Sequence, residues 1–316
     1  REGGNHLVAE LRGTGVETVV TGSKLASPAD RAVAKEPGKL AVAFERTLHA
    51  AGHPFLASHV INGKAVLPLA VMAEWLAHAA LHANPGLDFA GLDDLRVLKG
   101  VILDNGPRTV RAAAGKAAKE GALYRVAVEL QGDAGLLHAR GSVLLGKRPA
   151  APAPTAVPAW PAYPHTTQRA YAETLFHGMH FQGITSVDGC SEAGIAVTVT
   201  AAPAPSAWAA NPLRSAWLAD PLALDAAFQA AILWSAEHAG GPCLPAFMGR
   251  YRQFAEFPKD GTRVVLRMTR RGAMVQADAD FLTLKGALVA RLEGSEHAVD
   301  AGLAAAFKRS TVLATS

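Results

Sequence analysis

The sequence predicts an α+β protein built from two tandem units, each an antiparallel sheet wrapped around one long buried helix. Two apolar segments, each begun by a proline, have the length and composition of buried helices. Runs of strand character follow each of them, and a proline-rich stretch separates the two sets. Because the chain has 316 residues, of which 50% are hydrophobic, it is long enough to form two such cores.

The first 39 residues are expected to lie outside the two units. Residues 1–22 have the pattern of a helix followed by a short strand, and the polar, turn-rich stretch "GSKLASPADR" comes next. The chain also begins on an arginine in the middle of that pattern. We therefore expect residues 1–39 to be the tail of a preceding domain with its linker, and the chain to be a piece of a longer polypeptide.

The first unit is expected at residues 40–147. Its helix, "PLAVMAEWLAHAALHAN", runs from Pro68 to Asn84, with proline in the first turn and Asn-Pro-Gly as a stop. It is apolar nearly all round, which predicts burial. Four segments of strand character follow, at residues 95–104, 109–116, 123–132 and 136–146, and their alternation predicts an antiparallel meander.

A proline-rich segment, residues 148–165, is expected to be a semi-rigid extended linker. The second unit follows at residues 166–300, with two short strands after a loop, a helix from Pro221 to Gly241, and strands around 247–257, 263–270 and 275–292. Pro68 and Pro221 are equivalent in this duplication. Residues 301–316 are expected to be a C-terminal linker.

Composition excludes several classes of function. The net charge is +4 and the pI about 9.1, but the basic residues are scattered, so we expect no nucleic-acid binding and favour an acidic protein partner. Two cysteines make no disulfide framework, no secretory signal is evident, and no apolar run is long enough to span a membrane. These features predict a cytoplasmic protein. Motifs for a nucleophilic serine or for nucleotide binding are absent.

The first candidate for chemistry is "HVINGKAVLP", in which His59, Gly63 and Pro68 have the spacing HxxxGxxxxP. The glycine suits a backbone turn and the proline a helix start, so together they would fix an imidazole at the mouth of an apolar tunnel. Neutral imidazole is the natural base near pH 7. The alternative is a core histidine beside a turn glycine.

The second candidate is "LDAAFQ", which places Asp225 and Gln229 one turn apart on one face of an apolar helix. Burial would raise the pKa of Asp225, and a protonated carboxyl can donate to a departing hydroxyl while Gln229 holds it in place. The alternative is an ordinary charge near a helix N-terminus.

The third candidate is the loop "FHGMHFQG", from Phe176 to Gly183. The spacing of His177 and His180 suits a metal, but no third ligand follows at a recognised spacing. Glu74, His78 and His82 are interpreted as the polar stripe of their helix. We expect no metal, and favour a loop whose backbone N–H groups contact a carbonyl oxygen.

At these residues the chain resembles the dehydratase domains of polyketide synthases and, more closely, of polyunsaturated fatty acid synthases. "HVINGKAVLP" is similar to the first motif of the family and "DAAFQ" to the second, while "HGMHFQG" and "LPAFMGRYR" resemble two further segments. The resemblance covers about residues 40–300. Met179 stands where the family usually has proline, His177 where many members have tyrosine, and Leu69 where glycine is common.

The resemblance implies a double hotdog fold and a dyad of His59 and Asp225, with Gln229, Gly63 and Pro68 in support and His177, Gly178 and Phe181 in a substrate loop. It also implies the reaction: loss of water from a (3R)-3-hydroxyacyl thioester on the phosphopantetheine of an acyl carrier protein, giving a trans-2-enoyl thioester without a further cofactor. In that reaction His59 removes the α-proton, backbone N–H groups near Gly63 or the helix start polarise the carbonyl, and Asp225 protonates the leaving hydroxyl.

Two alternatives keep the same fold. One is a catalytically silent domain that binds acyl carrier protein or supports the architecture of a synthase, and the other is an isomerase or cyclase. The expected partners are an acyl carrier protein, neighbouring synthase domains with a ketoreductase-like one upstream, and a second copy of the chain in a homodimer. Arg250 and Arg252 are candidates for carrier docking, or ordinary surface arginines.

Overall fold

The two predicted helices form at the expected positions. The computed structural model describes residues 40–104, 106–156 and 159–310, so the expectations for residues 1–39 lie outside the described residues. Helix α2 spans Leu69–Ala83 between Pro68 and Asn84, and α4 spans Pro221–His238. Asp220 caps α4, because its Oδ1 accepts the N–H groups of Leu222 and Ala223 at 2.9 Å. Both helices are buried along most of their length.

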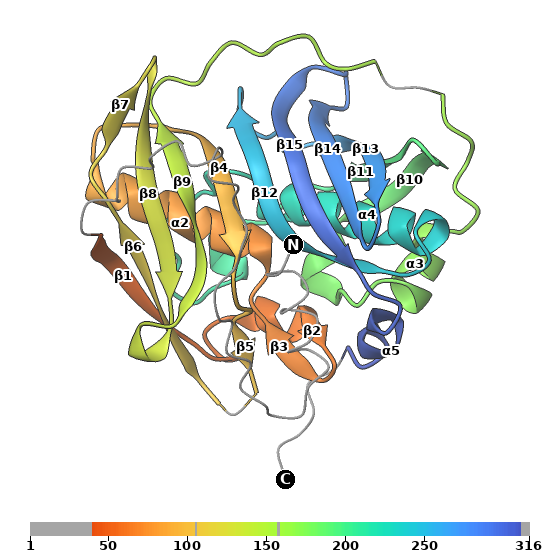
Figure 1. Cartoon of the computed structure of the whole chain (residues 1–316), viewed down its shortest axis with the longest axis horizontal. Coiled ribbons are helices and arrows are strands. Elements are labelled where there is room, and N and C mark those ends of the chain that lie inside the picture. The colour runs from red at the N-terminus through yellow and green to blue at the C-terminus, as the bar shows by residue number, and fades with distance from the viewer. Residues whose placement is uncertain (1–39, 105, 157–158, 311–316) are drawn as a thin grey trace.

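The first unit wraps a sheet around α2 (Figure 1). Its strands are β1 (Ala41–Leu48), β4 (Phe89–Val97), β6 (Arg108–Ala114), β7 (Ala118–Glu120), β8 (Leu123–Gln131) and β9 (Leu137–Leu145). The order is β1-β6-β8-β9-β4, with β7 paired to β8, so the sheet is antiparallel but only β6, β8 and β9 form a meander. Strand β1 was not predicted, because this largely exposed edge strand carries no strong apolar run.

The predicted strand at residues 95–104 is wrong as one element. Its first residues end β4, and its last belong to β5 (Ile102–Leu103), which pairs with the short strands β2 (Val60–Ile61) and β3 (Lys64–Val66) in a separate sheet. A two-residue hairpin links β2 to β3. This small sheet carries the residues on either side of Gly63.

The second unit repeats the plan around α4. Its strands are β10 (Ile184–Ser191), β11 (Gly194–Val199), β12 (Cys243–Gln253), β13 (Thr262–Arg271), β14 (Met274–Thr283) and β15 (Leu288–Val299), in the order β12-β15-β14-β13-β11-β10. The predicted strand at 275–292 is therefore two strands. The short elements η1 (Pro54–Ser58), η2 (Asp133–Gly135), α3 (Thr167–Glu173), η3 (Met179–Phe181), η4 (Pro205–Ala207) and α5 (Leu303–Phe307) lie in the connections.

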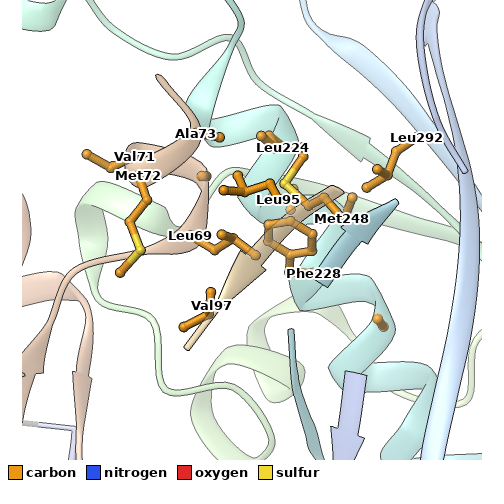
Figure 2. Packing of buried hydrophobic residues seen from close by; sticks show 14 of the residues in the cluster. Leu69, Val71, Met72, Ala73, Leu95, Val97, Leu224, Phe228, Met248 and Leu292 are labelled. Atoms are coloured by element: carbon orange, nitrogen blue, oxygen red, sulfur yellow. The ribbon is translucent and has the colours of Figure 1, made fainter. Parts of the chain in front are cut away.

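The two sheets join edge to edge. Strands β4 and β12 pair antiparallel, from Phe247 opposite Arg96 to Arg252 opposite Gly91, so the units share one 12-stranded sheet. Arg252 reinforces the junction by donating to both carboxylate oxygens of Asp93, at 2.5 and 3.1 Å. The main core lies between the helices and this sheet. Figure 2 shows Leu69 of α2 and Phe228 of α4 packed with Leu95 and Met248.

Two connecting segments pack against the units. Residues 146–156 and 159–163 form no helix or strand, as an extended linker would, but the N–H of Thr155 donates to Asp280 and the carbonyl of Pro161 accepts from Cys190. The C-terminal segment, which was expected to be a linker, departs further from the prediction. It contains α5, whose Leu303 and Phe307 are buried. No helix in the described ranges is long and apolar enough to cross a membrane.

Candidate active site

The hairpin that follows His59 fixes its imidazole. Asn62 and Gly63 both have positive φ, +52° and +75°, as a tight two-residue hairpin requires. Their strands bring Val66 next to His59: the N–H of Val66 donates to the His59 carbonyl at 2.9 Å, and the His59 ring contacts the Val66 carbonyl at 2.8 Å through Nδ1. Gly63 thus serves the turn. Its N–H donates to the carbonyl of Arg309, so Gly63 itself is engaged by the protein, and the helix start is the other donor that was expected.

The contact with Val66 decides the tautomer of His59. A backbone carbonyl only accepts hydrogen bonds, so Nδ1 carries the proton and the lone pair lies on Nε2. Burial lowers the pKa of His59 to about 4, against weaker backbone contacts that raise it. At neutral pH the side chain is therefore an uncharged base.

Asp225 lies on the second turn of α4 and is 3% exposed. The amide of Gln229 donates to its Oδ2 at 2.8 Å, as the spacing predicted. Burial raises the pKa of Asp225 to about 7, and the bond from Gln229 opposes the rise. The group therefore holds a proton through much of the range in which His59 is neutral.

Gln229 is itself fixed by two further contacts. Its amide nitrogen also donates to the carbonyl of Phe181 at 2.8 Å, and its carbonyl oxygen accepts from the hydroxyl of Tyr171 at 3.0 Å. Tyr171 in α3 was missed, because no spacing in the sequence relates it to α4. The network orients the amide so that its N–H group points at Asp225.

The loop from Phe176 lies against His59. His177 forms an isolated antiparallel bridge with His59, and the N–H of Gly178 donates to the carbonyl of Ser58 at 2.8 Å. A Cβ on Gly178 would lie 2.9 Å from the Cα of Ser58, so only glycine fits there. His177 is thereby placed with its Nε2 3.4 Å from Oδ2 of Asp225. Burial lowers the pKa of His177 well below its ordinary value, and His59 lowers it further.

The loop was expected to supply N–H groups to a substrate carbonyl, and four of them are engaged by the protein instead. Those of Gly178, His180, Phe181 and Gly183 donate to Ser58 or within the loop. At the start of α2, by contrast, the N–H groups of Leu69 and Ala70 have no acceptor among the residues that the structure describes. The start of α2 therefore offers two donors for a substrate carbonyl.

A narrow cavity of about 40 Å³ connects the side chains of His59, His177 and Asp225. His59, His177 and Asp225 are its titratable lining residues; apolar side chains of both units complete it, among them Leu69, Met72, Val97, Phe176, Phe228, Ile232 and Leu244. Gly178 and Phe181, expected as substrate contacts, do not line it. Figure 2 shows Leu69, Met72 and Val97 on one side and Phe228 on the other. The site thus forms between the units.

Donor atoms of His59, His177 and Asp225 lie within 4.8 Å of one another. Two zinc bonds of about 2.1 Å span at most about 4.2 Å, so the groups would have to close around an ion, and we assign no metal. His180, the other histidine of the HxxH spacing, contacts Ser58 at 2.9 Å instead.

Glu74 and His78 belong to the polar stripe that was predicted for their helix, but the stripe serves a contact inside the protein. Both are buried, and the carboxylate of Glu74 accepts from the N–H groups of Leu218 and Ala219 at 2.7 and 3.1 Å and contacts Nε2 of His78 at 2.9 Å. Leu218 and Ala219 precede α4, so the carboxylate connects the helix of the first unit to the start of the other helix.

The two docking candidates differ in their surroundings. The side chain of Arg252 is 14% exposed and engaged by Asp93 at the sheet junction. The side chain of Arg250 is 61% exposed and lies 3.6 Å from Glu293. Docking stays a prediction, and Arg250 is the residue free enough to serve it.

Comparisons with known proteins find dehydratase domains of synthases. A family model described as polyketide synthase dehydratase domain matches residues 31–129, and one described as polyketide synthase dehydratase N-terminal domain matches residues 147–298. A polyunsaturated fatty acid synthase polypeptide of Thraustochytrium sp. is 30% identical over 291 residues, which are 87% of this chain and 10% of that protein. The chain thus spans about a tenth of this relative's length.

Solved dehydratase domains have the same fold. The domain of PpsC from Mycobacterium tuberculosis, in complex with C12:1-CoA, superposes with a TM-score of 0.65 at 19% identity, over 81% of this chain and 93% of that one. Two inactive mutants of the CurK dehydratase, a His→Phe and an Asp→Asn variant, superpose with TM-scores of 0.61 and 0.62 at 17% and 18% identity, each over 84% of this chain and 92% of that one. The predicted double hotdog fold is confirmed.

Proposed function

Because the chain belongs to the polyketide synthase dehydratase family, we propose that it removes water from a 3-hydroxyacyl thioester carried on an acyl carrier protein. One observation carries the proposal: the imidazole of His59 and the carboxyl of Asp225 line one apolar cavity from two different units, where burial favours the neutral form of each. A β-elimination needs such a pair, since one group must take a proton while the other gives one.

The reaction follows from these two protonation states. Nε2 of His59 takes the α-proton of the thioester, the electron pair forms the Cα–Cβ double bond, and the β-hydroxyl leaves with the proton of Asp225 as water. The products are a trans-2-enoyl thioester and water. His59 is then protonated and Asp225 ionised, and transfer of one proton from His59 to Asp225, directly or through solvent, restores the starting state.

The α-proton of a thioester is weakly acidic, so the carbonyl oxygen must be stabilised as charge develops on it. The N–H groups of Leu69 and Ala70 at the start of α2 have no acceptor among the described residues, and Leu69 lines the cavity. A carbonyl oxygen placed there would also meet the positive end of the helix dipole. A single such donor contributes about 3 kcal/mol in other enzymes.

The relatives support these assignments without replacing their test. In the CurK dehydratase, replacement of one histidine and of one aspartate gave proteins described as inactive. The PpsC domain was solved with an acyl-CoA, which is also an acyl thioester. Because this chain spans about a tenth of its synthase relative, the carrier protein, the neighbouring domains, the cytoplasmic location and a homodimer are parts of the proposal.

The test is incubation of the protein with 3-hydroxyacyl carrier proteins of several chain lengths, followed by mass spectrometry of the acyl group. The wild type should remove one water, whereas His59→Ala and Asp225→Asn should not. His82→Ala and Asp260→Asn, which change exposed residues of the same types, should retain activity. If the folded wild type neither dehydrates nor hydrates any substrate, the proposal is overturned in favour of a silent binding domain. A product with a shifted double bond or with a ring would identify the isomerase or cyclase alternative.

The pH dependence of kcat/KM gives a second check. The base must be neutral, which requires a pH above about 4, and the acid must be protonated, which requires a pH below about 7. We therefore expect a plateau between these limits and a decline above about pH 7. Activity that rises steadily through pH 8 would contradict the assignment of Asp225 as the acid.

A further inference from the structure

His177 is a titratable residue of the cavity for which the elimination has no role. Its side chain is 2% exposed, and its ring stacks on Phe176 with the centroids 3.9 Å apart, which restrains its plane. Nε2 lies 3.4 Å from Oδ2 of Asp225, while Nδ1 is buried and has no hydrogen-bond partner among the described residues. The ring therefore presents one nitrogen to the catalytic carboxyl and none to another protein group.

Gln229 decides which oxygen of Asp225 carries the acid proton. Its amide donates to Oδ2 at 2.8 Å, and an oxygen that bears a proton accepts poorly, so the proton belongs on Oδ1. No residue that the structure describes is hydrogen-bonded to Oδ1, which leaves it free to face a substrate. The remaining lone pair of Oδ2 is available to His177.

The tautomer of His177 follows from the same reasoning. A neutral imidazole has one N–H group, and at Nδ1 that group would be a buried donor without an acceptor. At Nε2 it points at Oδ2. The separation of 3.4 Å is longer than an ordinary N–H···O bond, as catalytic contacts often are before a substrate binds. The contact should shorten when Asp225 becomes a carboxylate, because charge strengthens it.

We propose that His177 is a positioning residue for the acid: together with Gln229 it holds Oδ2 as the acceptor oxygen, keeps the acid proton on Oδ1, and stabilises the carboxylate left when that proton departs with the hydroxyl. This inference rests on the proposed function. It adds to the predicted role of His177 as a substrate-loop contact, which stays a prediction. The titratable groups around Asp225 are His59 in the first unit, His177 in the loop and Tyr171 in α3.

The variants His177→Gln and His177→Asn separate positioning from packing. Both are polar and smaller than the imidazole, but only the Gln amide reaches as far as Nε2 of histidine. Loss of a charge-assisted donor should lower kcat of His177→Asn about 10- to 100-fold with little change in KM, and His177→Gln should recover much of it. In His177→Asn the decline of kcat/KM should also move to higher pH, since the carboxylate has lost a donor. Met179→Ala, at an exposed position of the same loop, is the control.

The pKa of Asp225 provides a readout that does not need activity. Carbon-13 NMR of labelled aspartate carboxyl groups, with Asp225→Asn to assign the signal, should show a higher pKa in His177→Asn than in the wild type or in His177→Gln. If folded His177→Gln and His177→Asn have the same kcat and the same pKa at Asp225, the inference is overturned. The proposed function still stands in that case as long as the wild type is active. An inactive wild type would reject the proposed function, and the NMR titration would still test the contact.

Discussion

Burial shifts the protonation of His59, His177 and Asp225 in the directions that an elimination needs. An apolar cavity disfavours charge, so it lowers the pKa values of both imidazoles and raises that of the carboxyl. At neutral pH the cavity can therefore hold neutral imidazoles beside a protonated acid. Burial keeps both the base and the acid in their neutral forms, so a single narrow cavity provides both.

The raised pKa of Asp225 should lower the free energy of unfolding at neutral pH, and Asp225→Asn should remove this loss. The pKa of Asp225 rises from 3.8 to about 7 on folding, so between these values the unfolded chain has lost a proton that the folded chain retains. The folded state then loses up to about 1.4 kcal/mol per pH unit as the pH rises. Asparagine does not titrate, and its carbonyl can still accept from Gln229.

We therefore expect Asp225→Asn to match the wild type in free energy of unfolding near pH 4, to exceed it increasingly up to about pH 7, and to keep a constant advantage above that. Urea denaturation at several pH values measures the difference. An Asp260→Asn control, at an exposed site, should show no such trend. A difference that shrinks as the pH rises would show that the carboxyl is not buried in its protonated form.

At the scale of elements, the loop from Phe176 is held to η1 by a close backbone contact. Gly178 packs on Ser58, and His177 next to it bridges to His59. The sequence predicted the position of this loop but not that contact, since a glycine in a loop gives no indication of which backbone approaches it. The two long helices were more predictable, because Pro68, Asp220 and Pro221 are local start signals that act within one turn.

The close contact makes Gly178→Ala a test of how accurately the loop must be placed. The added Cβ would lie 2.9 Å from the Cα of Ser58, so the loop must move and His177 with it. Displacements of about 1 Å near reacting groups can cost about 100-fold, and we expect dehydration to slow by about 10- to 100-fold. Met179→Ala changes the adjacent exposed side chain and should react at the wild-type rate. Equal rates for the two variants would show that this contact does not position the site.

At the scale of the whole molecule, the distance between His59 and Asp225 depends on how the two units join. The β4–β12 pairing connects their sheets, and the contacts of Glu74 with Leu218 and Ala219 connect their helices. Gly91 lies in the sheet junction, where a Cβ would come 2.2 Å from the carbonyl oxygen of Tyr251. No side chain fits there without separating the strands.

Gly91→Ala should therefore weaken the junction of the two units. We expect the free energy of unfolding to fall by about 1–3 kcal/mol, together with a loss of dehydration, because His59 and Asp225 belong to different units. Gly115→Ala is the matched control, since its Cβ would lie 3.1 Å from the flexible end of Leu40 and 3.7 Å from the carbonyl oxygen of Ala127, which is an ordinary contact. Denaturation and activity measured on both variants test this. A Gly91→Ala protein as stable and active as the control would show that the junction does not determine the site.

Local features of this protein could be predicted from the sequence. Helix lengths, caps, the Asn62–Gly63 turn and the pairing of Asp225 with Gln229 depend on residues a few positions apart, whose periodicity and spacing are visible in the chain. The tertiary structure was needed to show that the two sheets merge, that the N–H groups of Leu69 and Ala70 have no acceptor among the described residues, and that His177 lies beside Asp225. These depend on strand edges and buried polar contacts between distant segments, for which pairing and burial, rather than any local pattern, fix the partners.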